Sequence, residues 1–157
     1  MDILNDEFLL FLRCARQNNL RYMLIGGYAV NYYGYNRNTN DLDVWIAPTN
    51  ENKLLLINTL LCMKYSATEV ECLNAEDFTV PFVGNFGTTG SRIDVLTIVD
   101  NTFSFDEAEK KLATFEITEG VFMNLVPYDY LIQMKLKARR PKDFIDVAEL
   151  NKLRNPK

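Results

Sequence analysis

The segment DLDVWIA, residues 41–47, places two carboxylates at the start of an apolar stretch that is typical of a buried β-strand. Alternate residues of a strand point to the same face, so we expect Asp41 and Asp43 to project together while Leu42 points the opposite way. Two carboxylates this close repel each other unless a proton or a cation neutralises them. The segment therefore predicts a strand that carries concentrated negative charge at the border of the core.

These acids have an ordinary explanation and a metal-binding one. In the ordinary explanation, one carboxylate caps a turn and the other pairs with Arg37 or Arg92. In the second, the pair binds Mg²⁺, which prefers oxygen ligands and keeps water molecules for a phosphate substrate. Asp94 favours the second explanation, because it lies inside RIDVLTIV (92–99), an otherwise apolar strand where a charge is costly unless it is paired or metal-bound. An ion pair with the adjacent strand or with Arg92 is the ordinary explanation for Asp94.

Two glycines and a loop before the acids are candidates for phosphate binding. Gly26 and Gly27 stand between a predicted strand at 22–25 and the start of a helix, where the backbone can approach a ligand and free N–H groups face outward. Close packing of the strand against the helix explains the glycines about equally well. Arg37 and Thr39 precede the acids and either reach phosphate oxygens or are solvated loop residues.

The composition limits which residue types could take part in catalysis. The chain has no histidine, which excludes Ser-His-Asp and Cys-His catalysis and HExxH zinc sites. A net charge of −4 argues against a general polyanion binder, although residues 135–142 contain five basic side chains and no acid. Catalysis would have to use carboxylates, lysine, arginine, hydroxyls or a metal held by oxygen.

The cysteines and the hydropathy predict a cytoplasmic protein. Cys14, Cys62 and Cys72 are odd in number and widely spaced, so we interpret them as reduced, mostly buried thiols. No apolar run approaches the roughly 18 residues of a membrane span. The first residues are acidic where a secretory signal would be basic, so the sequence predicts no export segment and no membrane association.

The order of predicted elements indicates one mixed α/β (α+β) domain over residues 1–157, with helices flanking a mixed sheet. Pro81 is expected to place its strand at an edge or a bulge, and Glu119-Gly120 to turn a hairpin. The predicted helices cover 5–18, 28–34, 50–63, 105–112, 127–140 and 141–153, and the predicted strands 22–25, 41–47, 66–73, 78–84, 92–99 and the hairpin 113–126.

The basic stretch lies on the predicted C-terminal helices. Lys135, Arg139 and Lys142 are spaced i, i+4 and i+7, but Pro141 is expected to interrupt the helix and leave only Lys135 and Arg139 aligned. A solvated helix face explains most of these residues.

Taken in chain order, these motifs resemble the nucleotidyltransferase superfamily typified by DNA polymerase β. Its signature is a glycine pair opening a helix, DxD on the next strand and a lone acid on a later strand. The chain is most similar to small bacterial members, through GGYA at 26–29, RNTNDLD at 37–43, and Lys135 followed by Arg139, KD at 142–143 and Asp146. Gly27 stands where many members have serine, and the roles of Arg139, Lys142, Asp143 and Asp146 are left unassigned.

The resemblance implies a polymerase β-like fold with a catalytic core at about 20–100 and C-terminal helices at about 127–153. It implies that Asp41, Asp43 and Asp94 are catalytic and bind two Mg²⁺, with Mn²⁺ as an alternative. Gly26 and Gly27, with Lys135, would face the phosphates of an NTP. Arg37 and Thr39 would contact the same phosphates.

The resemblance also implies transfer of an NMP to an acceptor: RNA or a protein in a toxin–antitoxin setting with an antitoxin-like partner, or a small molecule such as an antibiotic. Two rival readings remain open. One is a binding module of the same fold that keeps the nucleotide or partner contacts without turnover. The other is a structural protein whose acids are only ion-paired.

Overall fold

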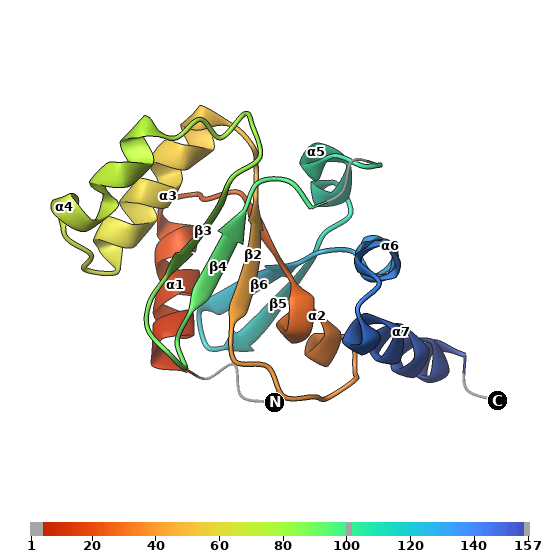
Figure 1. Cartoon of the computed structure of the whole chain (residues 1–157). Helices are drawn as coiled ribbons and strands as arrows, with labels where there is room; N and C mark the ends of the chain where they lie inside the picture. The colour runs from red at the N-terminus through yellow and green to blue at the C-terminus, as the bar shows by residue number, and fades with distance from the viewer. Residues whose placement is uncertain (1–4, 100–101, 156–157) are drawn as a thin grey trace.

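The computed structural model describes residues 5–99 and 102–155, and in this part of the chain helices and strands are interspersed (Figure 1). The helices are α1 (Asp6–Gln17), α2 (Gly26–Tyr32), α3 (Asn50–Cys62), α4 (Ala67–Val70), a 3₁₀ turn η1 (Glu71–Ala75), α5 (Phe105–Glu109), α6 (Tyr128–Ala138) and α7 (Pro141–Arg154). The strands are β1 (Tyr22–Ile25), β2 (Leu42–Ile46), β3 (Val83–Phe86), β4 (Ile93–Leu96), β5 (Ala113–Thr118) and β6 (Val121–Leu125).

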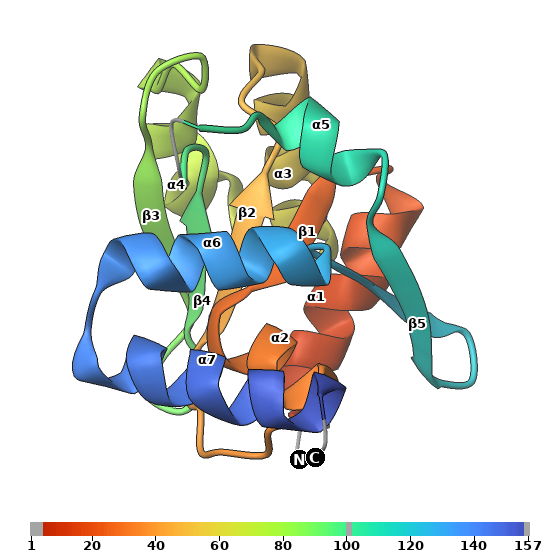
Figure 2. The same cartoon turned by 90° about the vertical axis from the view of Figure 1, so that its right-hand side faces the viewer.

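The strands form one six-stranded mixed sheet in the order β3-β4-β2-β1-β6-β5. The pairs β2–β4 and β1–β6 are parallel, and the other three neighbouring pairs are antiparallel. Helices α1 and α3 cover one face of the sheet, and α2, α6 and α7 lie on the other (Figures 1 and 2). The chain is therefore an α/β protein, with its two C-terminal helices packed side by side in front of the sheet (Figure 2).

The α1–α3 layer closes the larger part of the core. The side chain of Asn5 caps α1 by accepting from the N–H of Glu7, and the apolar face of the helix buries Phe8, Phe11 and Leu12 completely. On the sheet side of this layer, β2 contributes its alternate residues Leu42, Val44 and Ile46, all fully buried. The opposite face of β2 carries Asp43 and Trp45, so the charged site and the main core lie on opposite sides of one strand.

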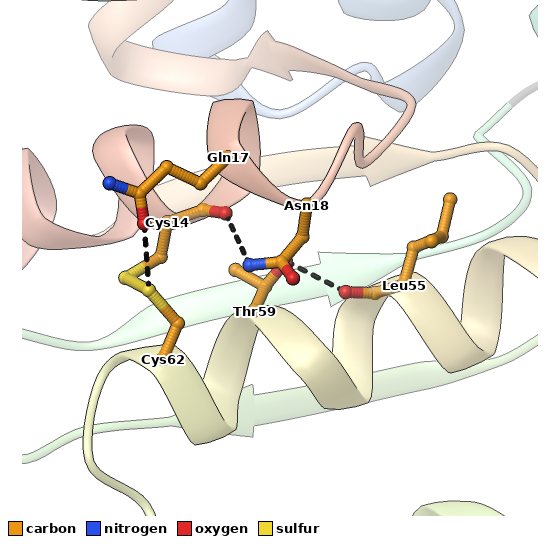
Figure 3. Close-up of a disulfide and its surroundings, with 6 residues drawn as sticks. All are labelled: Cys14, Gln17, Asn18, Leu55, Thr59 and Cys62. Atoms are coloured by element: carbon orange, nitrogen blue, oxygen red, sulfur yellow. Dashed lines mark hydrogen bonds between the residues drawn. A yellow bond between two sulfur atoms is a disulfide. The ribbon is translucent and has the colours of Figure 1, made fainter.

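The prediction of reduced cysteines is wrong for two of the three. Cys14 of α1 and Cys62 of α3 form a disulfide with Cα atoms 5.7 Å apart (Figure 3). The last turns of the two helices bring these residues together although 48 positions separate them, a juxtaposition that no local pattern reveals. Cys72 is a free cysteine, but it is exposed and not buried as expected.

The segment 66–73, predicted as a strand, is helical. Ser66 caps α4 by accepting from the N–H of Glu69, and the Glu69 carboxylate accepts from the N–H of Ser66 in return. Val70 and Leu73, three residues apart, are its buried residues. The capping box therefore prevails over the β-branched residues of this segment, because it satisfies the backbone groups locally.

Other elements follow the prediction with shifted ends. β3 starts two residues after Pro81 and is an edge strand, as expected, and the hairpin of β5 and β6 turns at 119–120. The strand predicted at 92–99 pairs only over Ile93–Leu96, and α5 stops at Glu109. The helix predicted to run to residue 140 ends at Ala138, where Arg139 takes a left-handed conformation with φ 55°.

The described residues include no helix that combines the length and apolar character needed to cross a bilayer.

Candidate active site

Strand pairing brings the predicted acids together. β2 and β4 run parallel with Asp43 opposite Asp94, so their side chains share the face of the sheet that carries α2, α6 and α7. Asp41 lies in the bend just before β2. All three carboxylates line a single cavity of about 620 Å³, which is within the usual range of small-molecule sites, roughly 300–1,000 Å³. The three acids therefore lie at one cavity, as expected, while their binding of a metal stays a prediction.

Asp43 is the most perturbed of the three. Burial raises its pKa from 3.8 to about 6, with further increases from the charges of Asp94 and Asp41 and decreases from Lys135 and Lys142. A carboxyl group with this pKa is mostly protonated below about pH 6, and a nearby positive charge favours its ionised form. The three carboxylates therefore repel one another, and a bound cation would reduce that repulsion.

Arg92 neutralises part of that charge. Its Nη2 atom lies 2.9 Å from Oδ2 of Asp94 and 3.3 Å from Oδ2 of Asp41, so the ion pairs expected in the ordinary explanation of these acids do form. The neighbouring carboxylates in turn raise the pKa of Arg92, mainly through the hydrogen bond with Asp94. Among the described residues no three Asp, Glu, Cys or His side chains are already arranged as a metal-binding group.

The all-oxygen donor set of Asp41, Asp43 and Asp94 nevertheless fits a hard divalent cation. One nitrogen of Arg92 already contacts both Asp41 and Asp94, so these two carboxylates can share one positive charge. The third, Asp43, faces Asp94 across the β2–β4 pair.

Neither glycine position leaves room for a side chain, because neighbouring residues of the predicted site lie too close. Gly26 has φ 67°, and a Cβ added to it would collide with the carboxylate of Asp43. A Cβ on Gly27 would lie 2.7 Å from Cβ of Thr39 and 3.4 Å from Nη1 of Arg37. The structure thus packs both glycines against loop and strand residues that line the same cavity. The packing explanation for the glycine pair holds, and it places the backbone at the cavity wall.

The opposite wall is basic and comes from α6 and α7. Lys135 is only 4% exposed, and its Nζ lies 2.9 Å from Oδ2 of Asp146 and 3.2 Å from Oδ1 of Asp143, both of which are fully buried. Nε of Arg37 lies 2.8 Å from Oδ1 of Asp146, and its Nη2 donates to Oδ2 at 3.1 Å. Arg140 donates from Nε to Oδ2 of Asp143 at 2.7 Å.

This cluster holds three cations and two carboxylates. Burial raises the pKa of Asp143, but hydrogen bonds from Arg140 and Lys135 outweigh it and leave the pKa lowered. Asp143 is therefore ionised near neutral pH, and the three cations of the cluster outnumber its two carboxylates beside the cavity.

Sequence reasoning missed the role of Asp143 and Asp146. With Val147 and Leu150 they occupy the i, i+3, i+4, i+7 positions that a helix turns toward a core, and all four are buried. Two charged residues in an apolar helix stripe are a signal for a buried ion pair. Arg139, expected to align with Lys135, is instead exposed beyond the end of α6 and does not line the cavity, whereas Lys142 does.

The cavity therefore has three kinds of lining. The sheet contributes Asp41, Asp43 and Asp94 with Arg92, and the loop and C-terminal helices contribute Arg37, Lys135, Arg140 and Lys142. Between them is an apolar portion formed by Leu96, Ile98, Val99, Leu131 and Met134.

No protein-family model and no curated protein matches this sequence, so the assignment of the site depends on its own geometry.

Proposed function

We propose that the chain is an Mg²⁺-dependent nucleotidyltransferase that moves an NMP from an NTP to an acceptor. The observation that carries the proposal is that three carboxylates and a group of basic side chains line the same cavity. A nucleoside triphosphate bound with a divalent cation has the complementary pattern, since the metal needs oxygen ligands and the phosphates need cations.

Each side chain then has a defined task. Asp41, Asp43 and Asp94 would hold Mg²⁺ (Mn²⁺ is the alternative), which when bound stabilises charge on the phosphates and lowers the pKa of the acceptor hydroxyl. Lys135 and Arg37 stay fixed by Asp146, so they present positive charge to the phosphates with little loss of side-chain entropy.

The other residues that line the cavity would contact the remaining parts of the substrates. Gly26 and Gly27, at the start of α2, line the cavity, so a phosphate bound there would approach the backbone closely. The apolar portion of the cavity suits a nucleobase. Asp94 accepts the proton of the acceptor hydroxyl, a new bond forms between that oxygen and the α-phosphorus, and pyrophosphate leaves.

Labelled nucleotides test this reaction directly. Each of the four NTPs, labelled at the α- or the γ-phosphate, is incubated with Mg²⁺ and an acceptor set of tRNA, cell protein and aminoglycosides. Transfer of an NMP moves the α-label but not the γ-label to the acceptor and releases pyrophosphate. Asp43→Asn should abolish transfer, and Asp129→Asn, which changes an exposed carboxylate outside the cavity, should not. Equal labelling by wild type and Asp43→Asn would remove the proposal.

A nucleotide-binding module without turnover is the second candidate. The observation in its favour is the pairing of Arg92 with two of the three acids. In that case Mg²⁺ with an NTP raises the melting temperature of the protein, while no acceptor becomes labelled and no pyrophosphate is released.

The branch of the proposal that involves a toxin–antitoxin pair has a separate test. Co-purification with the product of a neighbouring gene, and relief of growth arrest by that product, would support an antitoxin-like partner. A cytoplasmic location is likewise a proposal, but the Cys14–Cys62 disulfide removes the cysteine argument for it, because disulfides are rare in a reducing cytosol. Fractionation of the native cells would check the location.

A further inference from the structure

Arg92 lies between two cavities and has room to move. Besides the main cavity it lines a second one, formed with Asn40, Asp41 and the turn Gly87-Thr88-Thr89-Gly90. Its side chain is 49% exposed, while its carbonyl oxygen is held by the N–H of Leu42 at 2.9 Å. The backbone is therefore anchored and the guanidinium can change position without a change in the sheet.

One nitrogen of that guanidinium bridges two acids. Nη2 contacts Oδ2 of Asp94 and Oδ2 of Asp41, and these two side chains are proposed ligands of the divalent cation. Two cations that need the same carboxylates repel each other at such distances, so the binding of one disfavours the other.

We propose that Arg92 competes with the divalent cation for Asp41 and Asp94 and turns toward the second cavity when the metal binds. The inference rests on the proposed function, because it assumes that the three carboxylates are the metal ligands. In the absence of metal, Arg92 screens the repulsion among these carboxylates. The consequence is a site whose affinity for free metal is lower than its carboxylates alone would provide.

Metal binding without catalysis tests this proposal. The dissociation constant of Mn²⁺ is measured by the paramagnetic resonance signal of the free ion for wild type, Arg92→Gln and Asp94→Asn. Loss of the competing cation should lower the dissociation constant by about fivefold in Arg92→Gln, the effect expected of one partly exposed ion pair. Asp94→Asn should weaken binding strongly. Arg13→Gln, an exposed change on α1 with the same loss of charge, should bind Mn²⁺ like the wild type.

Thermal unfolding in EDTA gives an independent readout. Arg92→Gln should melt at a lower temperature than wild type and Arg13→Gln should not, because only the former leaves the carboxylates unscreened. Mn²⁺ should then raise the melting temperature of Arg92→Gln by more than that of the wild type.

The outcomes separate the two proposals. If Arg92→Gln binds Mn²⁺ no more tightly than wild type while Asp94→Asn still loses binding, the role of Arg92 is wrong and the proposed metal site stands. If wild type and Asp94→Asn bind Mn²⁺ equally weakly, both proposals fall together.

Discussion

Lys135 and Asp146 form a buried ion pair, with Nζ 2.9 Å from Oδ2 and 4% and 1% of the two side chains exposed. The lysine belongs to α6 and the aspartate to α7, so the pair joins the two C-terminal helices. Because the second oxygen of Asp146 contacts Arg37 from the loop before β2, the same carboxylate connects the helices to that loop.

Replacing Lys135 should therefore destabilise the protein. We expect Lys135→Met to cost about 2–3 kcal/mol, since it leaves two buried carboxylates with fewer partners, although Arg37 and Arg140 remain. Lys152→Met removes an exposed lysine of similar geometry, paired with Glu149 at 3.0 Å, and should cost less than about 1 kcal/mol. Urea unfolding measures both. Equal losses would show that the buried pair contributes no more than the surface pair.

The perturbed carboxyl of Asp43 should make stability depend on pH. Its pKa is about 6 in the folded protein against 3.8 ordinarily, so the folded state binds the proton more tightly than the unfolded state. The contribution of Asp43 to stability without divalent cations should therefore fall as pH rises from about 4 to about 6 and stay low above that range. Asp43→Asn should remove this fall. Relative to wild type, the free energy of unfolding of the variant should therefore be up to about 3 kcal/mol higher at pH 7.5 than the same difference at pH 4. Melting curves in EDTA across this range measure the effect, and parallel curves for the two proteins would contradict it.

Metal binding at Asp43 should show the opposite pH dependence. Because the carboxyl must lose its proton to ligate a cation, Mn²⁺ should bind more weakly below pH 6 and release protons on binding. Titration calorimetry in buffers of different ionisation enthalpy counts those protons. No proton release at pH 5.5 would mean that Asp43 is not a ligand.

The close packing of Gly27 against Thr39 predicts a double-mutant effect. Gly27→Ala should cost about 1–3 kcal/mol, because the added methyl overlaps Cβ of Thr39 and the loop must shift. In a Thr39→Gly background the same substitution should cost less, since the obstructing side chain is absent. If the cost of Gly27→Ala is the same in both backgrounds, the contact with Thr39 is not its cause.

The disulfide should stabilise the α1–α3 layer. Closing a loop between Cys14 and Cys62 restricts the unfolded chain and is worth about 2–4 kcal/mol. Reductant should lower the melting temperature of the wild type by several degrees and leave Cys14→Ser/Cys62→Ser unchanged. Alkylation of the denatured, unreduced protein should modify only Cys72. Three modified cysteines would show that the bridge does not form in solution.

The sequence alone was sufficient for much of the local structure. Short apolar stretches predicted β1 and β2, and alternation on both sides of Glu119-Gly120 predicted the β5–β6 hairpin. The sequence alone also identified the acids and the glycine pair as candidate site residues. An acid in an apolar strand and two glycines after a strand can be recognised without knowing what packs against them.

Local patterns failed where a neighbouring segment or a short-range hydrogen bond decided the outcome. The segment 66–73 has β-branched residues, but its capping box makes it helical. Lys135 belongs to a stretch that looks solvent-exposed by charge, yet it lies next to two buried aspartates that only the α6–α7 packing supplies.

What the sequence by itself determined is most of the strands and helices, with segment 66–73 as an exception, and the chemical types of the predicted site residues, since these depend on side chains a few positions apart. The tertiary structure alone decided that Asp43 faces Asp94, that Arg92 bridges Asp94 and Asp41, and that Cys14 meets Cys62. Those pairs are set by strand register and helix packing, which depend on how the whole core closes and not on any one segment.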